Sequence, residues 1–199
     1  MKGRVSMIKY PTPKIVVESD KRPVSAANRG MDFEDMINQT NDYYRETNRA
    51  VIYKKPTPIH VAHIQNPSSE QSFIDRAYFQ QPSTTDYNGI YRSKYLDFEA
   101  KETKNKTSFP IANIHRHQID HLRAIIEHGG IGFVLIFFTT LNEMYLIDGR
   151  IMDTYYHDLS RRSIPYEEIQ QKGYRIAQGY VAPVPYLDVV DKVYFSTQK

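Results

Sequence analysis

The chain has 199 residues, a formal net charge of +3 and no cysteine. This length is sufficient for one domain whose hydrophobic core needs no disulfide or metal to support it. The lack of cysteine excludes thiol nucleophiles, thiolate metal sites and disulfide frameworks, and it is compatible with a reducing compartment.

The longest apolar stretch, residues 131–138, is too short to cross a membrane, because a spanning helix takes about 20 residues. It favours a buried strand instead. The N-terminus lacks the apolar segment of a signal peptide, and its acids Glu18 and Asp20 are atypical of a transit peptide. We therefore expect a cytoplasmic protein with no membrane partner.

Positive charge is concentrated at the start of the chain. Residues 1–30 carry seven lysines and arginines against two acids, and they also hold three prolines without a sustained hydrophobic period. This composition predicts a flexible basic arm over residues 1–28, followed by one domain over residues 29–199. Such an arm is typical of polyanion binding, most often of nucleic acid, through release of counterions. A solvated disordered tail is the alternative.

The first ordered elements are expected near residue 30. Residues 30–48 place apolar side chains at helical spacing, with acids near the favourable N-terminal end of the helix dipole, which predicts a helix. A short strand is predicted over residues 50–55.

The next segment, residues 56–82, has prolines at both ends and a turn signal at residues 66–69. Its two arms, residues 59–65 and 73–80, alternate polar and apolar side chains. This pattern predicts an inserted β-hairpin. Because an isolated two-stranded ribbon is only marginally stable in water, the hairpin would gain order from a partner.

The stretch "YLDFEAKET" is strand-like. Successive side chains of a strand point to opposite faces, so Leu96, Phe98 and Ala100 would face a core. Asp97, Glu99 and Lys101 would share the other face. A solvated strand face with a weak ion pair is the simplest interpretation of that charged set.

A hairpin turn at Ser93 and Lys94 would place Asp86 opposite Lys101. Thr84, Asp86, Glu99 and Lys101 would then lie on one face of the sheet, whereas a slip of one residue would move Asp86 to the other face. Two carboxylates and neutral oxygens suit Mg²⁺, and an ammonium can stabilise charge on a phosphate. This geometry would make a phosphodiesterase site.

A further helix is predicted over residues 112–130, with a left-handed cap at Gly129 or Gly130. Its apolar stripe is interrupted by Gln118, whose amide needs either a structural hydrogen bond or a polar site beside the core. The helix also carries three histidines. We expect them to be exposed near a polyanion, and the alternative is that they bind zinc. They are His115, His117 and His121.

Two strands, residues 131–140 and 143–148, and a short helix, residues 163–173, complete the pattern. The order of elements predicts an α/β layer with a mixed central sheet flanked by helices. No G-x-S-x-G, Walker or H-E-x-x-H motif occurs, and "GGIG" at residues 129–132 runs from helix to strand, the wrong order for a dinucleotide fingerprint.

An acid followed on the next strand by acid-x-Lys is the core pattern of restriction-endonuclease-like nucleases. The longer strings "NRGMDFE", "KKPTPIHV", "TTDYNGIY", "LDFEAKETKNKTSFP" and "HQI" closely resemble the RecU family of Holliday junction resolvases from about Asn28 onward. The resemblance implies a restriction-endonuclease-like core with an inserted hairpin stalk. It also implies a homodimeric, structure-specific endonuclease that nicks four-way junctions symmetrically in homologous recombination and DNA repair.

The resemblance further implies a site and its cofactor. The catalytic residues would be Asp86, Glu99 and Lys101, and the metal ligands Thr84, Asp86, Glu99 and Gln118. The cofactor would be Mg²⁺, with Mn²⁺ as a substitute. Glu34 stands where related nucleases often place an accessory acid, and a helix N-terminal charge is the alternative.

The partners implied are four-way junction DNA, a second copy of the chain, and a recombinase or branch-migration protein. The implied DNA contacts are Arg29, Lys54, Lys55, Arg76 and Lys104. The alternative function is a non-catalytic junction-binding and strand-annealing protein that modulates a recombinase.

Overall fold

The structure is a computed structural model that describes residues 32–65, 67, 72–79 and 84–196. The predicted basic arm and Arg29 lie outside the described residues, as does most of the turn predicted at residues 66–69.

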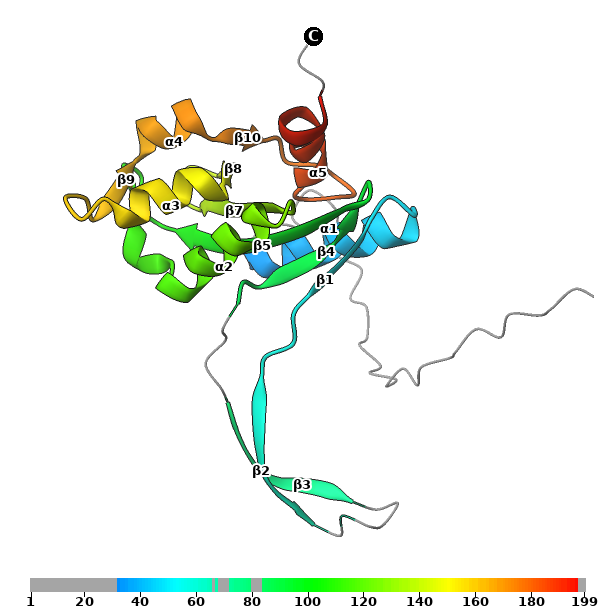
Figure 1. Ribbon diagram of the computed structural model, residues 1–199. Helices are drawn as coiled ribbons and strands as arrows, with labels where there is room; N and C mark the ends of the chain where they lie inside the picture. Colours follow the sequence, from blue (N-terminus) through cyan, green and yellow to red (C-terminus); the bar gives the residue numbers. More distant parts are fainter. Residues whose placement is uncertain (1–31, 66, 68–71, 80–83, 197–199) are drawn as a thin grey trace, which may run out of the picture. The chain divides into compact units, whose positions relative to one another are not determined.

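The main sheet has the strand order β1-β4-β5-β7-β8-β10 (Figure 1). Its strands are β1 (Val51–Lys54), β4 (Tyr87–Tyr91), β5 (Lys94–Thr103), β7 (Ile131–Phe138), β8 (Glu143–Asp148) and β10 (Tyr174–Ile176). Strands β5 and β7 are parallel, and every other neighbouring pair is antiparallel. The predicted mixed central sheet is therefore confirmed.

Two apolar clusters cover the two faces of this sheet. The helices are α1 (Phe33–Glu46), α2 (Arg116–Glu127), α3 (Gly149–His157), α4 (Tyr166–Lys172) and α5 (Tyr186–Val190). One cluster joins α1 and α5 to β5, and the other joins α2, α3 and α4 to β7. Side chains of β7 alternate between them, with Phe133 in the first and Val134 in the second. This burial on both faces accounts for the continuous apolar run of β7.

Helix α2 ends as the sequence predicts. Gly129 has a φ of +85°, the left-handed conformation that glycine adopts without steric cost. A single 3-10 turn (Ile111–Asn113) precedes α2, and a π-helical turn (Asp191–Phe195) follows α5. None of the helices among the described residues has the length and apolar character needed to cross a membrane.

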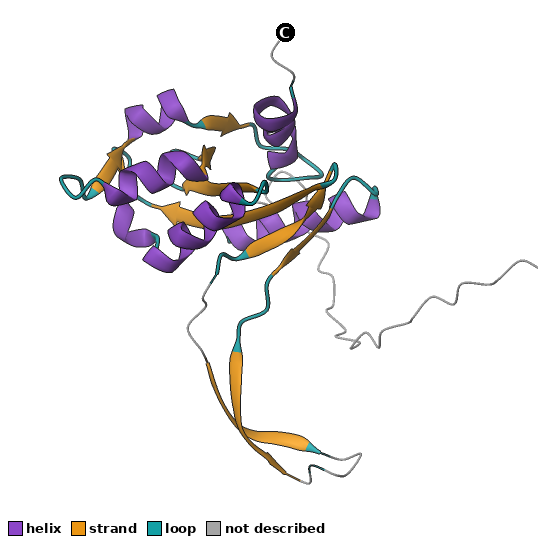
Figure 2. Cartoon of the chain, in the orientation of Figure 1, coloured by secondary structure: helices purple, strands orange, loops and turns teal. Residues whose placement is uncertain are grey.

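The predicted hairpin is present as a separate two-stranded sheet of β2 (Ile59–Gln65) and β3 (Phe73–Phe79), shown in Figure 2. All of its residues except Val61 are exposed. Bulges interrupt its register near His63, and Asp75 accepts hydrogen bonds across the pair. A second small sheet pairs β6 (Ser108–Pro110) with β9 (Ser163–Pro165).

The turn between β4 and β5 differs from the prediction. It is formed by Arg92 and Ser93, with φ angles of 47° and 61°, so that Tyr91 pairs with Lys94. The predicted turn one residue later was wrong, and the pairing is displaced by two residues. Because side chains alternate along a strand, a displacement of two keeps every side chain on its predicted face.

Candidate active site

Glu99 lies in the middle of β5, on the face opposite Leu96, Phe98 and Ala100. Its side chain is 0% exposed, and neither carboxylate oxygen has a hydrogen-bond partner among the described residues. The Lys101 ammonium lies 2.5 Å from Oε1, but outside the directions of a good hydrogen bond. A buried carboxylate is costly unless a cation or several donors approach it.

A second carboxyl group, that of Asp86, lies beside Glu99. If the β4–β5 register continues past the Tyr87–Phe98 pair, Asp86 comes opposite Glu99 and not opposite Lys101 as predicted. Burial, followed by the Asp86 carboxyl, raises the pKa of Glu99 to about 8, although Lys101 opposes the shift. Two adjacent carboxylates with unsatisfied oxygens fit a divalent cation, which would favour their charged forms.

The segment that carries Thr84 and Asp86 precedes β4. Both residues are partly exposed. The backbone oxygen of Asp86 accepts a hydrogen bond from the backbone N–H of Lys55 at 2.7 Å, which extends the β1–β4 ladder by one step. The Thr84 hydroxyl donates to the Thr85 carbonyl oxygen at 3.4 Å, close to the limit for a hydrogen bond.

Gln118 is buried, with 4% of its surface exposed, in the first turn of α2. Its Oε1 atom accepts a hydrogen bond from the backbone N–H of His115 at 2.9 Å. The structural hydrogen bond considered for this amide is therefore present. Because an amide oxygen has two lone pairs, the bond leaves one free, and a ligand role for Gln118 stays a prediction.

The sequence pattern predicts that Asp97 shares a face of the sheet with Glu99 and Lys101, but it assigns no role to Asp97. Its side chain is 0% exposed, and its carboxylate accepts hydrogen bonds from the Lys55 ammonium at 2.8 Å, the Tyr95 hydroxyl at 3.0 Å and the Thr85 hydroxyl. His121 Nε2 lies 3.2 Å from it. The alternation of β5, which puts Asp97 on the same face as Glu99, was the available signal.

The three histidines of residues 115–121 do not form a common site. The rings of His115 and His117 stack at 5.5 Å, whereas His121 contacts Asp97. Within the described ranges, no three His, Cys, Asp or Glu side chains are grouped to hold a metal. The Asp86 and Glu99 site differs from such a group because its other candidate ligands are neutral oxygens, those of Thr84 and Gln118.

The predicted accessory acid and the predicted DNA-binding residues differ in their surroundings. Glu34, at the start of α1, is paired with the ammonium of Lys54. Arg76 on β3 and Lys104 after β5 are exposed. The Lys55 ammonium donates to the buried Asp97 at 2.8 Å, and its DNA contact stays a prediction.

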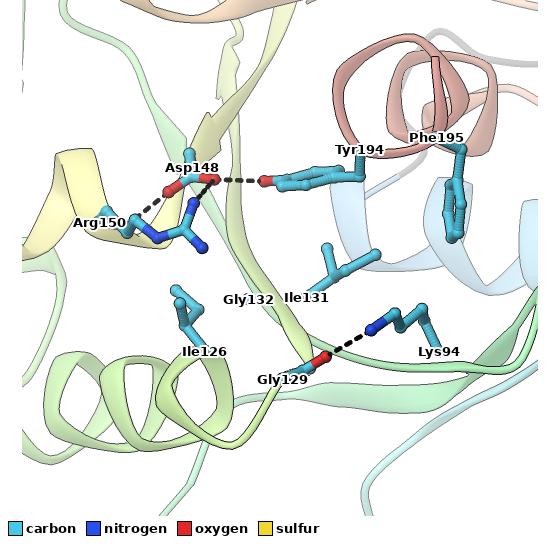
Figure 3. A pocket seen from close by; sticks show the side chains of 10 residues that line it. Lys94, Ile126, Gly129, Ile131, Gly132, Asp148, Arg150, Tyr194 and Phe195 are labelled. Atoms are coloured by element: carbon cyan, nitrogen blue, oxygen red, sulfur yellow. Dashed lines mark hydrogen bonds and ion pairs between the residues drawn. The ribbon is translucent and has the colours of Figure 1, made fainter. Parts of the chain in front are cut away.

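A cavity of about 350 Å³ lies elsewhere, between the end of α2 and the C-terminal helical turn (Figure 3). Tyr194 donates to Asp148 at 2.8 Å on one side of it, and Lys94 donates to the Gly129 carbonyl at 3.2 Å on the other. None of its lining residues is a predicted site residue.

Comparison with known proteins agrees with the motifs. Residues 28–192 match the family "RecU: Recombination protein U". The chain is 53% identical over 172 residues to the Holliday junction resolvase RecU of Geobacillus sp. (strain WCH70), covering 85% of this chain and 86% of that protein. It is 50% identical over 190 residues to the Holliday junction resolvase RecU of Oceanobacillus iheyensis, covering 94% and 96%.

Among solved structures, the chain is similar to Archaeoglobus fulgidus Hjc, a Holliday junction resolvase, with a TM-score of 0.40 and 9% identity over 67% of this chain and 90% of that one. The family match covers most of the chain, and the relatives are aligned over nearly their full length. The chain belongs to the RecU family.

Proposed function

We propose that the chain is a Mg²⁺-dependent Holliday junction resolvase that nicks two strands of a four-way DNA junction symmetrically. The relatives that carry this name support the proposal. The main chemical support is the arrangement at Glu99. This buried carboxylate has no hydrogen-bond partner among the described residues, and it lies beside Asp86 and 2.5 Å from the Lys101 ammonium. A solvated strand face would not bury that carboxylate.

Each side chain then has a distinct role. Asp86 and Glu99 would hold Mg²⁺, and the oxygens of Thr84 and Gln118 would complete the protein ligands. When bound, the ion supplies Lewis-acid stabilisation of charge on the scissile phosphate. The ammonium of Lys101 would contact a phosphate oxygen and stabilise the charge that develops there. Because alternate residues of β5 are packed in the core, the strand holds Glu99 and Lys101 in fixed positions.

The hairpin would recognise the junction. Tyr78 and Phe79 on β3 are 58% and 84% exposed, which suits stacking on unpaired bases at the open centre of a junction. Arg76 adds a cation on the same strand for phosphate contact. A two-fold dimer would present two such hairpins and two sites to the symmetric substrate.

The basic arm and the main domain would have separate roles. Residues 1–28, with Arg29, would add sequence-independent phosphate contacts or bind a recombinase, and residues 29–199 would form one nuclease domain in the cytoplasm. Lys104 follows β5 directly and is exposed, so it would contact a phosphate near Lys101.

Cleavage of a synthetic four-way junction tests the proposal. Incubation with Mg²⁺ or Mn²⁺ should yield symmetric nicks, and chelation with EDTA should abolish them. Asp86→Asn should abolish nicking while junction affinity in a gel-shift assay stays near that of the wild type. The matched control is Asp188→Asn, a surface carboxylate of α5 paired with Arg49, which should nick normally. Junction binding without any metal-dependent nicking would instead identify a non-catalytic annealing protein.

A further inference from the structure

The three segments that carry the candidate metal ligands meet at one side chain outside the ligand set. We infer that Asp97 is a positioning residue, which holds the segment of Thr84 and Asp86, strand β5 and helix α2 in the geometry that binds the metal. The inference rests on the proposed metal site.

Asp97 is suited to this role by its place on β5. It precedes Glu99 by two residues, so both carboxylates lie on the same face of one strand. Its side chain is 0% exposed, and its two oxygens accept hydrogen bonds from Lys55 and Thr85, which lie on other parts of the chain, and from Tyr95 of β5 itself. A buried charge with this many partners gives each of them a defined position, because a partner that moves away leaves the charge unsatisfied.

The first connection leads to Thr84 and Asp86. Thr85, between them, donates its hydroxyl hydrogen to Asp97 Oδ1. The Lys55 ammonium bridges the same groups, at 3.0 Å from the Thr85 hydroxyl and 2.8 Å from Asp97 Oδ2. The Lys55 backbone N–H also donates to the Asp86 carbonyl at 2.7 Å. Both the side chain and the backbone of this segment are therefore held relative to β5.

The second connection leads to α2. His121 Nε2 lies 3.2 Å from Asp97 Oδ2, and His121 follows Gln118 by three residues, nearly one helical turn. Residues three apart lie on the same side of a helix. His121 therefore approaches Asp97 from the side of α2 that also carries Gln118, although its Nε2 makes no hydrogen bond among the described residues.

Asp97 also lies at the base of the inserted hairpin. Lys55 and Thr85 flank the segment that contains β2 and β3, and both donate to the same carboxylate. Asp97 therefore binds the two chain segments from which the inserted hairpin leaves and returns.

Metal binding by the folded protein tests this inference. Isothermal titration with Mg²⁺ or Mn²⁺ should show that Asp97→Asn, which keeps the size of the side chain, weakens the metal Kd about tenfold or more. Asn41→Ala is the matched control. Asn41 is also buried, but its Oδ1 accepts from Tyr186 on the other side of the sheet. This variant should lose thermal stability and keep the wild-type metal Kd.

A second variant covers the case in which Asp97→Asn does not fold. Thr85→Val removes one donor without leaving an unpaired charge, and it should weaken the metal Kd by a smaller factor. Excess Mg²⁺ should restore nicking to either variant, but not to Glu99→Gln, which lacks the charged carboxylate of the metal site. Wild-type metal affinity in the folded Asp97 or Thr85 variant would overturn the inference. A wild-type protein that binds no metal would overturn the proposed metal site as well.

Discussion

The ammonium of Lys101 lies 2.5 Å from Oε1 of the buried Glu99, two residues away on the same face of β5. The side chain of Lys101 is 23% exposed, so it can reach both the carboxylate and a bound phosphate. Lys101→Ala should therefore reduce single-turnover nicking about 10²-fold or more while junction affinity changes little. Lys104→Ala, an exposed lysine just beyond β5, should have a much smaller effect. Equal rates for the wild type and Lys101→Ala would leave Lys101 as a simple ion-pair partner.

Gln118 accepts a hydrogen bond at the start of α2, and substitution can separate this role from the metal-ligand role proposed for it. Gln118→Glu keeps an oxygen that can accept from the His115 N–H, so α2 should remain stable and metal binding should persist. Gln118→Ala removes that acceptor and should lower the free energy of unfolding by about 1 kcal/mol, as loss of a helix cap does. Urea denaturation and metal titration of both variants provide the measurement. If Gln118→Ala binds metal with the wild-type Kd, Gln118 serves only the helix.

The exposed aromatic residues of the hairpin should determine preference for a junction over a linear duplex. Tyr78→Ser with Phe79→Ser should reduce that preference in competition binding and leave metal titration unchanged, because exposed side chains contribute little to folding. Leu159→Ser, at a position 96% exposed elsewhere, is the control and should change neither property. Unaltered preference in the double variant would assign selectivity to the spacing of the two sites in the dimer.

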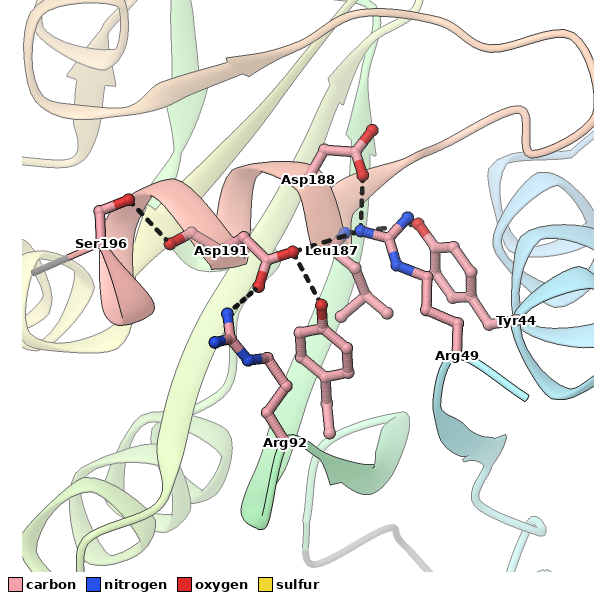
Figure 4. A network of polar contacts seen from close by, with 8 residues as sticks. Tyr44, Arg49, Arg92, Leu187, Asp188, Asp191 and Ser196 are labelled. Carbon is pink, nitrogen blue, oxygen red and sulfur yellow. Dashed lines mark hydrogen bonds and ion pairs between the residues drawn. The ribbon is translucent and has the colours of Figure 1, made fainter. Parts of the chain in front are cut away.

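Asp191 joins the C-terminal helical turn to the rest of the fold (Figure 4). It accepts hydrogen bonds from Tyr91 at 2.7 Å and Arg92 at 2.9 Å, and Arg49 donates to it at 3.4 Å. Burial raises the pKa of Asp191, but the hydrogen bonds outweigh burial and hold the pKa below its ordinary value of 3.8. A lowered folded-state pKa stabilises the protein above pH 3.8, and that stabilisation is lost as the pH falls through the folded pKa.

Asp191→Asn should therefore lower the free energy of unfolding by about 1 kcal/mol at pH 7, and the difference from the wild type should shrink below about pH 3.8. Urea denaturation at pH 7 and pH 3 measures both values. The Asp188 side chain is 54% exposed beside Arg49, so Asp188→Asn should lower the free energy of unfolding at pH 7 by less than Asp191→Asn does. A difference that is as large at pH 3 as at pH 7 would show that the charge of Asp191 is not what stabilises this contact.

Removal of residues 1–28 should flatten the salt dependence of DNA binding, because six of the seven lysines and arginines of residues 1–30 would be lost. Binding measured across a range of salt concentrations gives the slope, and nicking at low salt should persist as the control for folding. An unchanged slope would show that residues 1–28 make no phosphate contacts.

Local patterns determined a large part of this protein. The alternation of Leu96, Phe98 and Ala100 with Asp97, Glu99 and Lys101 was predictable, because the side-chain period of a strand is two whatever the surrounding fold. The hairpin arms and the end of α2 were predictable for similar reasons, since proline restricts the backbone locally and glycine permits a positive φ. The longer motifs led to the family.

Only the tertiary structure decided the rest. The turn at Arg92 and Ser93 has no glycine or asparagine to mark it, although both residues adopt positive φ angles. Tyr87 and Tyr91 are buried, and their packing selects the register in which this turn closes. Apart from Tyr95, the groups around the Asp97 carboxylate come from residues 55, 85 and 121, which are distant along the chain. A buried carboxylate acquires such partners only when the sheet and α2 have packed together, so no local pattern could reveal its role.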